Sequence, residues 1–300
     1  MSNVAAALSE WMPQQRWYSA KGVTPRLRVI ATIDSTADDA NIVVAIVLDE
    51  GPDKPVLYQV PVTLRASPLP LLEPIAVIDG LYMYDGPHDR AFASALIEAI
   101  GEESTIGGDG AFATGSRLSG PGRVTSSRVL EGEQSNTSVI CEVDGGSAPT
   151  LIAKVFRVLH HGENPDVSTQ AALTAHGSNR VPRTVGSVMA TWPDSGRSAG
   201  TATGHLAIVQ EFLPGLQDAW RVALASAATD EDFAGRAFDL GVATAEVHAT
   251  LASALPTVVL PAPRAPIMKM GCVITAILMC LKHLLTCWAS YRQKINWQSL

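Results

Sequence analysis

The chain has 300 residues, 47% of them hydrophobic, and a formal net charge of −7. This length predicts about two domains with ample apolar material for buried cores, and the acidic balance argues against nucleic-acid binding, which needs a basic face. The first thirty residues lack a charged segment followed by an apolar one, so we predict no signal peptide and expect a cytoplasmic protein. The four cysteines, Cys141, Cys272, Cys280 and Cys287, fit neither a zinc motif nor a disulfide framework.

The N-terminal third favours a helix followed by an antiparallel meander, because runs rich in Val and Ile alternate with Asp, Gly and Pro turns. The predicted elements are a helix over Val4–Trp11, strands over Leu27–Ile33, Ile42–Leu48, Val56–Val62, Ile75–Ile78 and Leu81–Tyr84, and a helix over Asp89–Ile100. The glycine-rich stretch Gly107–Gly122 is predicted as a loop or linker.

Aromatic residues surround Arg16 in the segment Trp11–Tyr18. Two interpretations are open: the rings stack on the guanidinium, or Trp11 and Trp17 anchor a hydrophobic core. We favour the core anchors.

A second set of strands begins near Arg128, and a helix starts at Asn164-Pro165, since Asn caps helices and Pro suits the first helical position. The predicted elements are strands over Thr137–Val143, Leu151–Arg157, Arg183–Met189 and Leu206–Phe212, and a helix that ends near Gly177. Thr229–Asp232 has the capping-box pattern and is predicted to open a long helix with one apolar stripe. That stripe comprises Phe233, Ala237, Leu240, Thr244, Val247 and Leu251.

Lys154 is the first candidate functional residue, because it interrupts the otherwise apolar strand Leu151–Phe156. Alternation places it on the same face as Ile152 and Phe156. A lone ammonium group on such a face is costly unless an anion meets it, and in kinases that anion is a nucleotide phosphate. The alternative is a lysine on an edge strand that points into solvent.

Two polar stretches flank this strand and supply further candidates. The segment Glu131–Val139 precedes the strand by one hairpin, and its amides and hydroxyls could face phosphates. The segment Ile208–Gly215 has the form of a hinge between two lobes, with a backbone able to bond an adenine edge. The alternative is a strand that simply ends in a turn. The predicted ATP-binding residues are Gln134, Ser135, Asn136, Thr137, Ser138, Lys154, Gln210, Glu211 and Phe212.

These residues, in this order, resemble actinobacterial maltokinases over about residues 7–256. The resemblance is carried by Trp11–Tyr18 with Lys21-Gly22, Glu133–Ile140, Lys154–Arg157, Asn164–Val167 and His248–Ala252. It implies an α+β fold: an N-terminal cap domain with an antiparallel sheet, a protein-kinase-like small lobe and the start of a helical large lobe.

The resemblance also implies a domain organisation and an activity. The cap would span residues 1–88, a helix and linker 89–123, the ATP-binding small lobe 124–215, the start of the large lobe 216–260 and an aberrant tail 261–300. The activity would be Mg²⁺-dependent transfer of phosphate from ATP to maltose, giving maltose 1-phosphate. Another small sugar or aminosugar stays open as the acceptor, and so does the oligomeric state.

Two departures from the family pattern bear on activity. Ser168 stands where a glutamate that pairs with the lysine is expected, and Asp166 or Glu163 could replace it. No Asp or Glu follows Glu246, so no catalytic or metal-binding Asp is predicted. We therefore expect an inactive maltokinase-type chain, with a non-catalytic nucleotide-binding or protein-interaction remnant as the alternative.

The last forty residues differ in composition from the rest, with five basic side chains, three cysteines and no acid. A shifted reading frame would explain this change, and a divergent ending that packs on the long helix is the alternative. The uncharged run Met270–Leu281 is shorter than the ~20 residues that span a bilayer, so no transmembrane helix is predicted.

Overall fold

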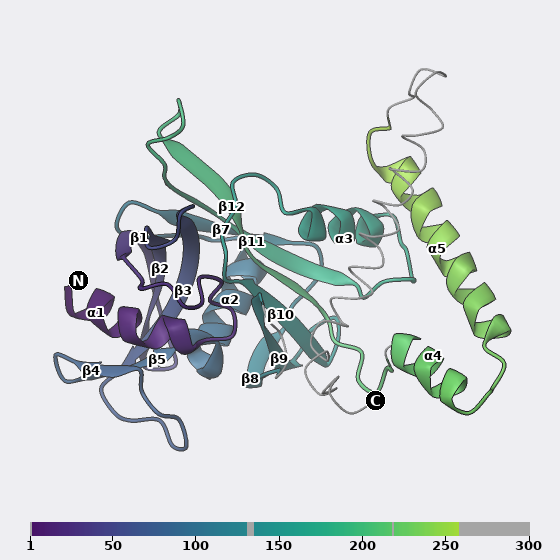
Figure 1. Ribbon diagram of the computed structural model, residues 1–300, viewed down its shortest axis with the longest axis horizontal. Coiled ribbons are helices and arrows are strands. Elements are labelled where there is room, and N and C mark those ends of the chain that lie inside the picture. Colours follow the sequence, from purple (N-terminus) through teal and green to yellow (C-terminus); the bar gives the residue numbers. More distant parts are fainter. Residues whose placement is uncertain (1, 131–134, 218, 258–300) are drawn as a thin grey trace. The chain divides into compact units, whose positions relative to one another are not determined.

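The computed structural model describes residues 2–130, 135–217 and 219–257 (Figure 1). The chain divides into two compact units. The first is formed by Met1–Val167 and Thr184–Phe212, and the second by Ser168–Arg183 and the chain from Leu213 on.

The first unit opens with a helix and a five-stranded antiparallel sheet, as the sequence predicts. Helix α1 (Ser2–Trp11) leads into a short 3₁₀ turn and then into β1 (Leu27–Ala37), β2 (Ala40–Asp49), β3 (Val56–Arg65), β4 (Ala76–Ile78) and β5 (Leu81–Asp85). The strand order is β1-β2-β3-β5-β4. Leu8, Met12 and Trp17 pack with Tyr58 and Val60 in one buried cluster, so the prediction of a core-anchoring tryptophan is confirmed for Trp17.

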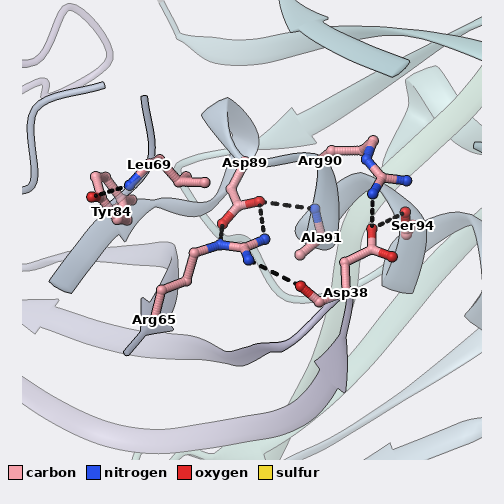
Figure 2. A network of polar contacts seen from close by, with 8 residues as sticks. All are labelled: Asp38, Arg65, Leu69, Tyr84, Asp89, Arg90, Ala91 and Ser94. Carbon is pink, nitrogen blue, oxygen red and sulfur yellow. Dashed lines mark hydrogen bonds and ion pairs between the residues drawn. The ribbon is translucent and has the colours of Figure 1, made fainter. Parts of the chain in front are cut away.

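Helix α2 (Arg90–Glu102) follows this sheet and begins where a carboxylate caps it (Figure 2). Asp89 accepts a hydrogen bond from the Ala91 amide at 3.0 Å and two from the guanidinium of Arg65, at 2.7 and 2.8 Å. Arg65 also donates to the Asp38 carbonyl at 2.9 Å. The start of α2 is thereby tied to the end of β3 and to the turn between β1 and β2.

A second, seven-stranded antiparallel sheet completes the first unit. Its strands are β6 (Thr105–Gly107), β7 (Phe112–Arg117), β8 (Arg123–Val129), β9 (Asn136–Asp144), β10 (Thr150–Phe156), β11 (Thr184–Pro193) and β12 (Thr201–Glu211). They pair in the order β6-β7-β11-β12-β10-β9-β8. Side chains of α2 and of both sheets share the largest buried cluster, which includes Ile33, Ile97, Ile100, Val139 and Leu151.

The prediction of a loop or linker over Gly107–Gly122 is wrong, because β7 lies within it. Its glycines serve close packing rather than chain flexibility. A β-carbon on Gly115 would collide with the carbonyl group of Ala99 in α2, so only glycine allows this helix to approach the strand so closely.

The remaining elements are helical. Helix α3 (Pro165–Ala175) ends before Gly177, as predicted, whereas α4 (Ala219–Ala228) was not predicted. Helix α5 (Ala234–Ala254) starts later than the capping-box pattern indicates. Thr229 instead closes α4 by donating to the Ala225 carbonyl, and Asp232 accepts from the Ala234 amide at 2.8 Å.

The predicted apolar stripe of α5 is largely confirmed. Val247 is buried, Phe233, Leu240, Thr244 and Leu251 are half-buried, and Ala237 is exposed. The α+β class with antiparallel sheets is confirmed as well. No helix within residues 2–257 is long and apolar enough to cross a membrane, and the calls on the tail 261–300 lie outside the described residues.

Candidate nucleotide site

Lys154 lies near the middle of the seven-stranded sheet, on β10 between β9 and β12. Its neighbours Ala153 and Val155 point into the core, so Lys154 points to the opposite face. Ile152 and Phe156 share that face as predicted, and the ammonium nitrogen lies 6.0 Å from the centre of the Phe156 ring. The interpretation of Lys154 as an edge-strand residue is therefore wrong.

The ammonium group of Lys154 meets a carboxylate. Its Nζ donates to Oδ2 of Asp166 at 3.2 Å, and the two side chains are 15% and 32% exposed. Asp166 lies in the first turn of α3, where the positive end of the helix dipole also favours a negative charge. The expected substitute for the missing glutamate is thus Asp166, two residues before Ser168.

The start of α3 is held by two further hydrogen bonds. Asn164 Oδ1 accepts from the Asp166 amide at 2.9 Å, and the Asn164 amide donates to Nδ1 of His205 on β12 at 3.1 Å. Burial lowers the pKa of His205, and the charge of Glu163 opposes this only in part. The neutral ring therefore serves as an acceptor that fixes the helix carrying Asp166.

Ser138 and Gln210 present buried polar atoms on the same face as Lys154. Ser138 is directly opposite Lys154 across β9 and β10, and Gln210 is opposite Ile152 across β12 and β10. Ser138 Oγ and Gln210 Nε2 have no hydrogen-bond partner among the residues that the structure describes. Buried polar atoms are normally paired, so two unpaired ones beside a lysine indicate a site for a polar ligand.

The structure does not bring all the other predicted ATP-binding residues to the sheet face of Lys154. Ser135 is exposed and accepts from the Asn136 amide group at 3.4 Å. Thr137 points to the opposite face, where its hydroxyl oxygen accepts from Arg157 Nε at 2.8 Å. Glu211 is opposite Leu151 on β10 rather than beside Lys154. Gln134 lies outside the described residues.

The predicted hinge coincides with the end of the sheet. The Phe212 amide donates to the Thr150 carbonyl at 3.0 Å, and the boundary between the compact units falls directly after Phe212. Gly215 then adopts a positive φ of 76°.

A buried arginine that the sequence gave little reason to single out lies three residues after Lys154. The Arg157 side chain is completely buried, and its Nη2 donates to both carboxylate oxygens of Asp85 at 2.9 and 2.7 Å. Its guanidinium carbon lies 4.6 Å from the centre of the Trp17 ring, while Arg16 is exposed. A guanidinium therefore does stack on this tryptophan, but it comes from the second sheet. An arginine at the end of an apolar strand was the available signal.

No group of three or more His, Cys, Asp or Glu side chains able to hold a metal ion occurs in residues 2–130, 135–217 and 219–257.

Comparison with known proteins agrees with the resemblance for the N-terminal region. Residues 11–89 match the family model of the maltokinase N-terminal cap domain. Among solved structures, glucosamine kinase in complex with glucosamine, ADP and inorganic phosphate is 19% identical with a TM-score of 0.49, covering 83% of this chain and 52% of that one. A second glucosamine kinase structure, crystal form A, is 20% identical with a TM-score of 0.49, covering 84% and 52%. The chain thus spans about half the length of these proteins.

Proposed function

We propose that this chain carries the cap and the nucleotide-binding lobe of an ATP-dependent sugar kinase of the maltokinase type. The observation that carries the proposal is the Lys154–Asp166 pair on a sheet face that also presents Ser138 Oγ and Gln210 Nε2, two buried atoms without a hydrogen-bond partner among the described residues. A kinase small lobe uses a strand lysine, oriented by a helix carboxylate, to bind nucleotide phosphates. The match of residues 11–89 to the maltokinase cap adds independent support.

In this proposal, ATP supplies the phosphoryl group, and the chain's own residues bind and orient it. Lys154 gives the positive charge for the phosphates, and Asp166 holds the ammonium group in place until they arrive. Ser138 Oγ and Gln210 Nε2 offer a hydroxyl and an amide to the nucleotide, and the Ile208–Phe212 strand end offers backbone groups. No step is assigned to a metal ion.

The acceptor in the full reaction is proposed as maltose, giving ADP and maltose 1-phosphate. The cap match alone favours maltose over another small sugar or aminosugar. The proposed domain order is cap (1–88), small lobe (124–215) and start of the large lobe (216–260), with α2, β6 and β7 in the segment 89–123 between the first two. We propose a cytoplasmic location.

A calorimetric titration with ATP tests the nucleotide site. Replacing Lys154 by Ala is expected to weaken ATP binding at least ~tenfold, because a charge-assisted phosphate contact is lost. Asp166→Asn is expected to have a smaller effect in the same direction. Lys54→Ala removes an exposed cap lysine and serves as the matched control. ATP binding by the Lys154 variant equal to that of the parent would contradict the proposal.

A second candidate function is nucleotide binding without catalysis. It is favoured by the composition of residues 247–300, which contain no Asp or Glu that could act as a catalytic base or metal ligand. A coupled ADP-release assay with maltose, and in parallel with glucosamine, separates the two. We expect ATP binding without turnover, and turnover above background with either sugar would overturn this second candidate.

A further inference from the structure

The strand that carries Lys154 is bonded to the cap immediately beyond the lysine. Arg157 is completely buried and binds Asp85 of the cap through Nη2 and Thr137 of β9 through Nε. Trp17 covers its guanidinium face. One side chain therefore joins the Lys154 strand, its neighbour β9 and two segments of the cap.

Gln59 on β3 forms the second half of this connection from the cap side. Its buried side-chain amide donates to the Phe156 carbonyl at 2.8 Å and to the Leu206 carbonyl at 2.6 Å. Its backbone amide donates to the Arg157 carbonyl at 2.9 Å, and the Leu159 amide donates to the Leu57 carbonyl at 2.8 Å. The cap strand therefore bonds β10 and β12, which lie side by side and carry Lys154 and Gln210.

These contacts restrain the strand end where the lysine is placed. Phe156 is two residues from Lys154 and on its face, so a shift of the Phe156 backbone moves the ammonium group. Hydrogen bonds from buried side chains to backbone carbonyls fix such a segment more tightly than apolar contact does, because they are directional. The Arg157 and Gln59 side chains lie away from the sheet face proposed for the nucleotide, so they act through the strand.

We propose that Arg157 and Gln59 are positioning residues through which the cap sets the place of Lys154 and thereby the affinity for ATP. The cap would then be part of the nucleotide-binding machinery and not only an appended domain. This inference rests on the proposed nucleotide site.

Titrations with ATP test this positioning role in the parent and three variants. Each protein is titrated at a temperature where circular dichroism shows it to be fully folded. Gln59→Leu and Arg157→Lys are expected to weaken ATP binding about tenfold, since small misplacements of a binding group commonly cost that much or more. Tyr18→Phe is the matched control. It removes a buried cap hydrogen bond to Asp49 at 2.6 Å and makes no contact with β10 in the described interactions. The parent and this control are expected to bind alike.

Affinity for Gln59→Leu and Arg157→Lys equal to that of Tyr18→Phe would overturn the positioning role while leaving the nucleotide site intact. Failure of the parent itself to bind ATP would overturn both proposals. If Gln59→Leu does not fold, Arg157→Lys still decides, because it keeps the positive charge opposite Asp85 while removing the Nε hydrogen bond to Thr137.

Discussion

The two compact units differ in how deeply their most buried ion pairs lie. In the first unit, the Arg157–Asp85 pair has side chains 0% and 10% exposed, and the Arg65–Asp89 pair 16% and 2%. In the second unit, the side chains of the Arg180–Glu246 pair are 42% and 49% exposed. Buried charges depend on their partners, whereas exposed ones are hydrated in any case. Electrostatic contributions to stability should therefore be concentrated in the first unit.

Apolar side chains show the opposite distribution. The helices of the second unit expose Trp220, Leu224 and Phe238, the last of them at 72%, and bury Val247. The first unit exposes Leu71 and Val77 but buries many large side chains in clusters shared by α2 and both sheets. An apolar substitution should therefore cost more stability in the buried clusters of the first unit than on the exposed helix faces of the second.

The largest expected effect is that of Asp85→Ala. It leaves the buried Arg157 guanidinium without its carboxylate, so we expect the free energy of unfolding to fall by about 3–5 kcal/mol. Urea denaturation followed by tryptophan fluorescence measures this change. Glu246→Ala in the exposed pair is the control and should leave the midpoint unchanged. An equal loss in the free energy of unfolding for Asp85→Ala and Glu246→Ala would contradict the expected difference between buried and exposed ion pairs.

A smaller effect is expected for Asp89→Asn, which removes the charge opposite Arg65 and weakens the cap of α2. At pH 7 we expect a loss of about 1–2 kcal/mol. Burial alone would raise the pKa of Asp89, but the bonds from Arg65 and the Ala91 amide outweigh it and lower the pKa. The contribution is therefore present above the ordinary value near 4 and is lost as the pH falls through the lowered pKa. Urea midpoints of parent and variant should converge between pH 5 and pH 2, and a constant gap would contradict this sign.

Most strands and helices could be predicted from the sequence because alternation and turn residues are local signals. The meander of the cap and the start of α3 at Asn164-Pro165 are examples. Strands β6, β7 and most of β8 were not predicted. The glycines of β7 also serve close packing against α2, and that contact is not encoded locally. Helix α4 (Ala219–Ala228) was not predicted either, and it ends directly before the capping-box pattern Thr229–Asp232.

The candidate site could be predicted only where local sequence signals mark its residues. Lys154 stands out as a charge in an apolar run, and the strand register that pairs it with Ser138 follows from the hairpin. Its contact with Asp166 depends on the path of the chain into α3, so the sequence left Asp166 and Glu163 both open. Gln59 and Asp85 lie about 70 to 100 residues from the strand they bind, and nothing local in the sequence indicates these contacts.

The smallest expected effect concerns His205, the half-buried acceptor that holds Asn164. Burial lowers the pKa of this ring, so the unfolded chain takes up the proton first as the pH falls. The neutral ring thus contributes stability above the ordinary value of about 6.5, and this contribution is lost as the pH falls through the lowered pKa. Protonation of Nδ1 also removes the acceptor for the Asn164 amide and so loosens the turn that presents Asp166 to Lys154.

An NMR titration should find the His205 pKa below 6.5. In His205→Asn, which keeps an acceptor but does not titrate, the loss of stability between pH 7.5 and 5.5 should be smaller than in the parent. If the stability of the parent and of His205→Asn depended on pH in the same way, the buried His205 would contribute no more to pH dependence than an exposed histidine. That result would contradict the expected difference between buried and exposed charges.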